Sequence, residues 1–181
     1  MSRDMPADAR RRVVWAGLAG AGILLATGGL SGCGFALRQA PSFAFTSLRF
    51  TNYVATPVSR ALQRELAAAG IQVVNTAAVA GQPPVQVVLA VLTDQRERVV
   101  VGQTTSGQVR ELQLRTRFRF RLSTSSGKYL IDETEMLQER DISFTETGAL
   151  AKAAEEQLMF SDMQNDIVQQ IMRRLAAVKS L

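Results

Sequence analysis

A strict alternation of side chains over residues 111–122 constrains the fold of this 181-residue chain more than any other feature. One set is apolar or small: Leu112, Leu114, Thr116, Phe118, Phe120 and Leu122. The other set ends in four arginines: Glu111, Gln113, Arg115, Arg117, Arg119 and Arg121. Because neighbouring side chains of a β-strand point to opposite faces, this pattern predicts a strand with one face in the core and a row of arginines on the other.

A return strand is predicted over residues 129–142, after a turn at Ser125-Ser126-Gly127-Lys128. A three-residue loop would pair Ser125 with Tyr129 and place acidic side chains opposite arginines. The expected pairs are Arg121–Glu133, Arg119–Glu135, Arg115–Glu139 and Phe118–Met136, and Arg117 falls opposite Leu137 without an acidic partner. Two interpretations stay open for the arginine row. It is either a solvated, salt-bridged sheet face, or a face that meets lipid phosphates or the acidic residues of a partner.

The segments before this hairpin predict further strands and one helix. Residues 43–50 and 85–101 are β-prone, and the second run is apolar on both faces, as a covered central strand would be. A helix is expected over residues 57–69, with Thr56 as N-cap and Gly70 just after its end. Residues 71–74 leave open whether they form a strand. Residues 76–84 and 102–107 are predicted loops.

A long C-terminal helix is predicted over residues 148–178. Its expected apolar stripe is Leu150, Ala154, Leu158, Ile167, Ile171, Leu175 and Val178, with Met163 beside it. The order β-α-β-β-β-α predicts an α+β two-layer sandwich, with two helices packed on one face of a mixed, roughly four-stranded sheet.

The N-terminus has the features of an export signal. Three arginines, Arg10 to Arg12, precede an apolar run over residues 13–30, and Leu30-Ser31-Gly32-Cys33 resembles the lipobox of bacterial lipoproteins. In such proteins the cysteine is acylated and becomes the new N-terminus. The sequence therefore predicts a signal peptide over 1–32, a lipidated tether over 33–42 and a single domain over 43–181. The alternative is an uncleaved transmembrane helix, for which this run is barely long enough.

The composition argues against catalysis and metal binding. The chain has no histidine, and Cys33 is its only cysteine, so the commonest general bases and metal ligands are missing. We expect no metal and no cofactor apart from N-acyl and S-diacylglycerol lipid on Cys33. The predicted signal peptide holds four of the 21 basic and two of the 16 acidic residues, which leaves a net charge of +3. This modest charge does not indicate nucleic-acid binding.

Several segments together resemble the LptE family of lipopolysaccharide-assembly lipoproteins. They are Cys33-Gly34-Phe35-Ala36-Leu37-Arg38, Ser106-Gly107-Gln108 ahead of Glu111 and Leu112, Ala149-Leu150-Ala151-Lys152 followed by Glu155, Glu156 and Met163, and Arg173-Arg174-Leu175. The resemblance implies an outer-membrane lipoprotein that plugs and helps assemble the β-barrel LptD, and that binds lipopolysaccharide during its delivery to the outer leaflet. Gly34, where aspartate would retain a lipoprotein at the inner membrane, is consistent with this location.

The resemblance also implies candidate binding residues. Of two basic positions associated with lipopolysaccharide in the family, one falls at Lys152 and the other at Thr105, which carries no charge. Arg98, Arg110 and Lys128 are the candidates to replace the missing charge. We expect Lys152, helped by Arg110, to pair with lipid phosphates. The alternative for Lys152 is a helix lysine whose only partner is Glu156 at i+4.

The partner-facing candidates are Arg115, Arg117, Arg119 and Arg121. Two other function classes compete with the LptE interpretation. One is an accessory lipoprotein of another envelope transport or secretion complex. The other is a lipid-tethered periplasmic enzyme, which the missing histidine disfavours.

Overall fold

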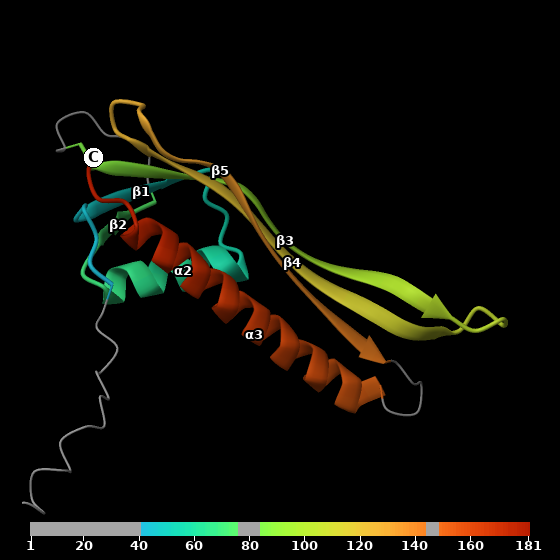
Figure 1. Cartoon of the computed structure of the whole chain (residues 1–181). Coiled ribbons are helices and arrows are strands. Elements are labelled where there is room, and N and C mark those ends of the chain that lie inside the picture. Colours follow the sequence, from blue (N-terminus) through green and yellow to red (C-terminus); the bar gives the residue numbers. More distant parts are fainter. Residues whose placement is uncertain (1–40, 76–83, 144–148) are drawn as a thin grey trace, which may run out of the picture. The chain divides into compact units, whose positions relative to one another are not determined.

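Five strands form one mixed sheet in the order β2–β1–β3–β4–β5 in the computed structural model, which describes residues 41–75, 84–143 and 149–181 (Figure 1). The strands are β1 (Ser47–Thr51), β2 (Gln72–Val74), β3 (Val87–Gln103), β4 (Val109–Thr124) and β5 (Tyr129–Ser143). β1 pairs in parallel with both β2 and β3, whereas β3, β4 and β5 are antiparallel. The sheet therefore has a short parallel part and a long antiparallel part.

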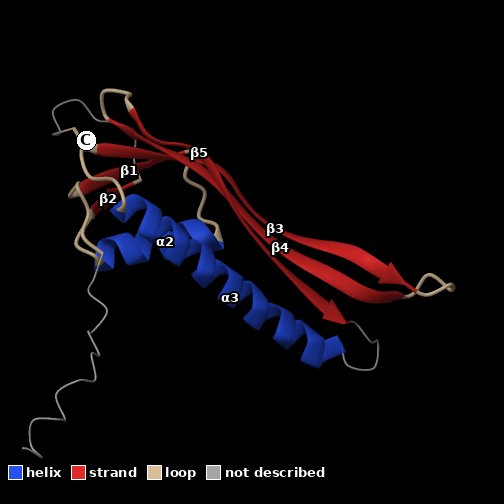
Figure 2. Ribbon diagram, viewed as in Figure 1, coloured by secondary structure: helices blue, strands red, loops and turns tan. Residues whose placement is uncertain are grey.

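Two helices, α2 (Pro57–Ala68) and α3 (Ala149–Ala176), lie against the same face of the sheet (Figure 2). This arrangement confirms the predicted α+β two-layer class. The expected count of about four strands is one too low. The difference is β2, the segment whose state the sequence left open, which pairs in parallel with β1 at the edge of the sheet.

The start of α2 is capped from a distant strand. Thr56 occupies the N-cap position, as predicted, but its side chain makes no capping hydrogen bond. Instead the Ser59 amide and hydroxyl donate to Oδ2 of Asp94 on β3, at 2.9 and 2.7 Å, and the Thr56 hydroxyl donates to the same oxygen. A carboxylate at a helix N-terminus also favours the helix dipole. The cap therefore ties α2 to the middle of the sheet.

A β-bulge changes which side chains of β3 face the helices. Val91 pairs with Phe120, but after a register shift between Val91 and Thr93 it is Asp94 that pairs with Phe118. Both phenylalanines are buried on the helix-covered face, so their direct partners point the same way. The predicted apolar central strand is thus correct only before the bulge, and beyond it β3 turns a polar row toward the helices: Asp94, Arg96 and Arg98.

The core has a large and a small cluster. The large one joins α2, the second half of α3 and the sheet, with Leu62, Phe118 and Ile171 at its centre. The small one lies under the first half of α3 and consists of Leu114, Ile142, Phe160 and Met163.

The expected apolar stripe of the C-terminal helix is wrong in its first half. Leu158 is 68% exposed, while Glu156 and Phe160 are buried. Two helical positions correspond to a rotation of about 200°, so Leu158 points away from the sheet. The side chain of Leu150 lies outside the described residues, as do residues 1–40 with the predicted signal peptide and Cys33.

Candidate functional site

The arginine row of β4 lies on the face of the sheet that the helices leave open. Its predicted register is confirmed in the middle of the hairpin, where Phe118 lies opposite Met136 and Arg117 opposite Leu137. Each of three arginines has a carboxylate partner on β5: Arg115 with Glu139 at 2.9 Å, Arg117 with Glu135 at 3.6 Å, and Arg119 with Glu133. These exposed pairs stabilise the fold by about 0.2–1 kcal/mol each.

Two predictions about the row are wrong. Arg117 is not without an acidic partner, because Glu135 reaches it diagonally across the strands. Arg121 does not pair with Glu133, since register shifts after Phe120 and after Leu122 place Ser123, and not Ser125, opposite Tyr129. The Arg121 guanidinium instead lies over the Tyr129 ring, with its carbon 5.6 Å from the ring centre.

Arg98 belongs to the polar row that the β3 bulge turns toward α3. Its Nε and Nη2 donate to the two carboxylate oxygens of Glu156, at 2.5 and 2.6 Å. Glu156 is buried, so this two-pronged contact satisfies a carboxylate that would otherwise lose its hydration. The hydrogen bond with Glu156 raises the pKa of Arg98, and partial burial opposes the rise. Arg98 is thereby committed to an internal partner.

Arg96 is a half-buried cation that the sequence did not single out. Its guanidinium carbon lies 5.1 Å from the centre of the Phe160 ring, and Nη2 donates to Gln164 at 2.9 Å. Burial lowers the pKa of Arg96, and the charge of nearby Asp94 opposes the shift. The bulge after Val91 is the feature that turns Arg96 inward, and a residue pattern read from one strand does not reveal it.

Lys152 lies in the first turn of α3, next to the Arg98–Glu156 contact. Its amino group binds Oε2 of Glu155 at 2.7 Å, so its partner is Glu155 at i+3 and not Glu156 at i+4. The Glu155 side chain is 43% exposed, which leaves this ion pair open to solvent and to competing anions. Lys152 therefore keeps a cation available beside Glu156, a buried carboxylate that Arg98 neutralises.

The other lipopolysaccharide candidates are spread along the domain. Arg110 lies at the start of β4, close to the hairpin turn that contains Thr105, whereas Lys128 lies in the turn at the other end of β4. The fourteen residue steps from Arg110 to Thr124 span about 46 Å of strand. Arg110 and Lys128 therefore cannot bind the same phosphate group.

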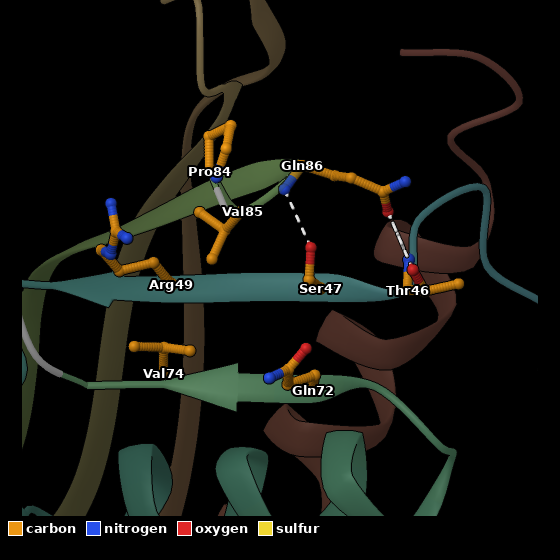
Figure 3. A pocket seen from close by; sticks show the side chains of 8 residues that line it. All are labelled: Thr46, Ser47, Arg49, Gln72, Val74, Pro84, Val85 and Gln86. Atoms are coloured by element: carbon orange, nitrogen blue, oxygen red, sulfur yellow. Dashed lines mark hydrogen bonds between the residues drawn. The ribbon is translucent and has the colours of Figure 1, made fainter. Parts of the chain in front are cut away.

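A cavity of about 470 Å³ opens on the same uncovered face near the start of β1 (Figure 3). It is lined by Thr46, Ser47, Arg49, Gln72, Val74, Pro84, Val85 and Gln86. Nε of Arg49 is buried there and has no hydrogen-bond partner among the described residues. None of the lining residues is acidic, so the cavity adds a cation to the uncovered face.

Neither described helix has the length and apolar character needed to cross a bilayer. In the part of the chain that the structure describes, no three His, Cys, Asp or Glu side chains come together where they could hold a metal ion. The candidate site described above consists of cations on a charged surface.

Comparisons with known proteins place this fold in a family. The model of the LptE family, described as lipopolysaccharide-assembly, matches residues 40–175. A search of curated sequences gives no significant match.

Solved structures give the same picture. The solution structure of a lipoprotein B from Nitrosomonas europaea is 30% identical with a TM-score of 0.64, and the match covers 80% of this chain and 91% of that one. A rare lipoprotein B from Shewanella oneidensis is 22% identical with a TM-score of 0.55, and the match covers 72% of this chain and 94% of that one. A minor lipoprotein from Acinetobacter baumannii is 19% identical with a TM-score of 0.56, and the match covers 75% of this chain and 94% of that one. The last two support the fold alone. The family match over most of the domain shows that this chain belongs to the LptE family of lipopolysaccharide-assembly lipoproteins.

Proposed function

We propose that the protein is an outer-membrane lipoprotein, acylated on Cys33, that plugs and helps assemble an LptD-type β-barrel and binds lipopolysaccharide during its delivery. The observation that carries the proposal is the charged, uncovered face of β4 and β5 in a member of a lipopolysaccharide-assembly family. The competing assignment is an accessory lipoprotein of another envelope complex. No step of the proposed role needs catalysis.

The uncovered face has the chemistry that a barrel lumen requires. Lumens of outer-membrane barrels are polar, so a plug must present hydrated and charged groups. Arg115, Arg117 and Arg119 are 31–38% exposed and their carboxylate partners 39–52% exposed, so every pair can still contact water or a charged wall. Internal pairing prevents a strong net charge, which would repel a wall of the same sign.

The barrel contact is expected to depend on the sign of these charges. Replacing Arg117 and Arg119 with glutamate would place four carboxylates close together and should reduce the amount of a large outer-membrane barrel that co-purifies with the protein. The matched control is Arg60→Glu with Arg64→Glu, two exposed arginines of α2. Co-purification from solubilised envelopes, normalised to the amount of folded protein, measures the effect. A wild-type protein that brings down no barrel in stoichiometric amount would favour the accessory-lipoprotein assignment.

The lipopolysaccharide site is centred on Lys152 in our proposal. A cation in the first turn of a helix is disfavoured by the helix dipole, and an anionic ligand would offset that cost. Because Arg98 neutralises Glu156, Glu155 is the one carboxylate among the described residues that competes with a phosphate for the Lys152 amino group. Arg110 extends the site toward the hairpin turn. Arg98 and Lys128 have weaker claims, since the first is engaged internally and the second lies at the far end of β4.

Reversing the charge of Lys152 tests this site. Lys152→Glu is expected to weaken lipopolysaccharide binding by about tenfold or more, because a charge-assisted contact of about 1.5–3 kcal/mol is lost. Pull-down with immobilised lipopolysaccharide measures the binding, and thermal unfolding checks that the fold is unchanged. Arg64→Glu, the reversal of an exposed charge on α2, is the control. Undiminished binding by folded Lys152→Glu protein would refute the assignment.

A further inference from the structure

One end of the domain carries cations without acidic partners. Six cations of the described residues bind a carboxylate: Arg98, Arg115, Arg117, Arg119, Lys152 and, on β5, Arg140, which pairs with Asp166. Ten other cations make no ion pair within the described residues, and five of these ten lie together near the β4–β5 turn and the end of α3. They are Arg121, Lys128, Arg173, Arg174 and Lys179. In these same segments, residues 121–132 and 173–181, Asp132 is the only acidic side chain.

This end also offers apolar and aromatic surface between the cations. A groove of about 330 Å³ runs between the start of β5 and the end of α3, lined by Tyr129, Leu130, Ile131, Arg174, Ala177, Val178, Lys179 and Ser180. Tyr129 is 57% exposed, which is unusual for a large ring without a partner surface. Arg173 and Arg174 line a second hollow directly beside it. The apolar lining residues, the exposed tyrosine and the flanking cations together resemble the surface by which peripheral proteins contact lipid.

The chain enters the domain at this same end. The Thr46 amide donates to Oε1 of Gln86 at 2.6 Å, and the Ser125 amide donates to the backbone oxygen of Gln86 at 3.2 Å. Gln86 thus joins the start of β1 to the β4–β5 turn, and Figure 1 shows the C-terminus beside them. The opposite end of the antiparallel strands holds the β3–β4 turn.

The tether length favours this end as the one nearest a bilayer. Ten residue steps separate Cys33 from Phe43, and an extended chain covers at most about 36 Å in ten steps. β3 alone, with 17 residues, spans about 56 Å. An anchor on Cys33 would therefore hold the chain entry, with the cations around it, closer to the membrane than the hairpin tip.

We propose that this end docks on an anionic phospholipid bilayer, with Lys128, Arg174 and Lys179 on the lipid phosphates and Tyr129 at headgroup depth. The inference rests on the proposed function, because the acyl anchor on Cys33 is what brings the bilayer within reach. Cations next to an anionic membrane and interfacial tyrosines both favour this contact. In a domain that plugs a barrel, the docking end lies at the periplasmic rim, where the tether has to reach the inner leaflet.

A single tryptophan introduced in place of Tyr129 can report the contact. Trp15 is the chain's only tryptophan, so the full chain carrying Trp15→Phe and Tyr129→Trp has one emitter. The protein, processed in cells, is reconstituted in phosphatidylcholine vesicles with or without phosphatidylglycerol. We expect a blue shift of the emission, and quenching by brominated lipid, only in the vesicles that contain phosphatidylglycerol. Adding Arg174→Gln and Lys179→Gln should lower the ratio of docked to undocked domain about 30-fold. Each lost cation lowers this ratio about fivefold, and the two factors multiply.

Two controls make the outcome decisive. Val101→Trp places the emitter at an exposed site toward the hairpin tip and should show no shift in either vesicle. Arg110→Gln with Lys152→Gln removes two cations elsewhere and should leave the emission of the Tyr129→Trp protein unchanged. No shift in the Tyr129→Trp protein, an equal shift in neutral vesicles, or no response to Arg174→Gln with Lys179→Gln would each overturn the proposal. Failure of the proposed function appears separately, as an unmodified Cys33 in the mass spectrum or as undiminished lipopolysaccharide binding by Lys152→Glu protein.

Discussion

Replacing Phe118 with alanine is expected to lower the free energy of unfolding by about 3–5 kcal/mol. Phe118 is fully buried at the centre of the large core cluster, with its ring 5.9 Å from that of Phe120. In the sheet it lies between Asp94 on β3 and Met136 on β5. The sheet cannot close the resulting cavity without moving strands on both sides, so most of the cost should persist. Urea denaturation followed by circular dichroism measures the change.

Leu137→Ala is the matched control for Phe118→Ala. Leu137 lies next to Met136 on β5, but it points to the uncovered face and is 39% exposed. Its removal should change the free energy of unfolding by about 0.5 kcal/mol or less. If both substitutions destabilised the protein equally, the assignment of the two sheet faces would be wrong, and with it the exposure of the arginine row.

Asp94→Ala is expected to destabilise the domain by about 2–4 kcal/mol, because it removes the partly buried carboxylate that caps α2. The Ser59 amide and hydroxyl both lose their acceptor, and Ser59 is completely buried, so water cannot replace the carboxylate. The N-terminus of α2 also loses a favourable negative charge. We expect amide hydrogen exchange to rise most in the first turn of α2, in parallel with the lower stability.

Two variants separate the cap from the charge. Asp94→Asn keeps one acceptor oxygen and should lose about half as much stability as Asp94→Ala. Thr56→Val removes the hydroxyl at the N-cap position, which donates to Asp94 instead of capping the helix, and should lose less than Asp94→Ala. A larger loss from Thr56→Val than from Asp94→Ala would mean that Thr56 is the true cap.

The two charged regions of the domain differ in how their cations are balanced. On the uncovered face, arginines and carboxylates neutralise one another across β4 and β5. At the end near Tyr129, the cations have no such partners within the described residues. A balanced face suits a polar protein wall, which carries charges of both signs, whereas an unbalanced one suits phosphate groups, which carry one sign. We therefore assign the balanced face of β4 and β5 to the barrel contact and the end near Tyr129 to the lipid contact.

Much of the antiparallel half of the fold could be predicted from the sequence, because its pattern is local. The alternation over residues 111–122 determines both faces of β4, and matching charge to charge predicts that Phe118 lies opposite Met136. Pro57 marks the start of α2, and Gly70, with φ of +83°, lies just beyond its end, where a left-handed residue is favoured. The alternative for Lys152, a pair with Glu156 at i+4, is not found, because its amino group binds Glu155 at i+3.

Only the tertiary structure shows the features that depend on how two strands pair with each other. The bulge after Val91 has no signature in β3 itself, since only pairing with β4 shows that Asp94 and Arg96 point inward. The contact of Arg121 also depends on strand pairing. Register shifts near the β4–β5 turn place its guanidinium over the Tyr129 ring, and not beside Glu133 as predicted. The periodicity of one segment predicts a strand and its two faces. It carries no information on the partner strand, whose register decides where a bulge exchanges the two faces. For this protein, therefore, the sequence alone determined the class of fold and the arginine row, and only packing decided which cations are neutralised and which remain available for a ligand.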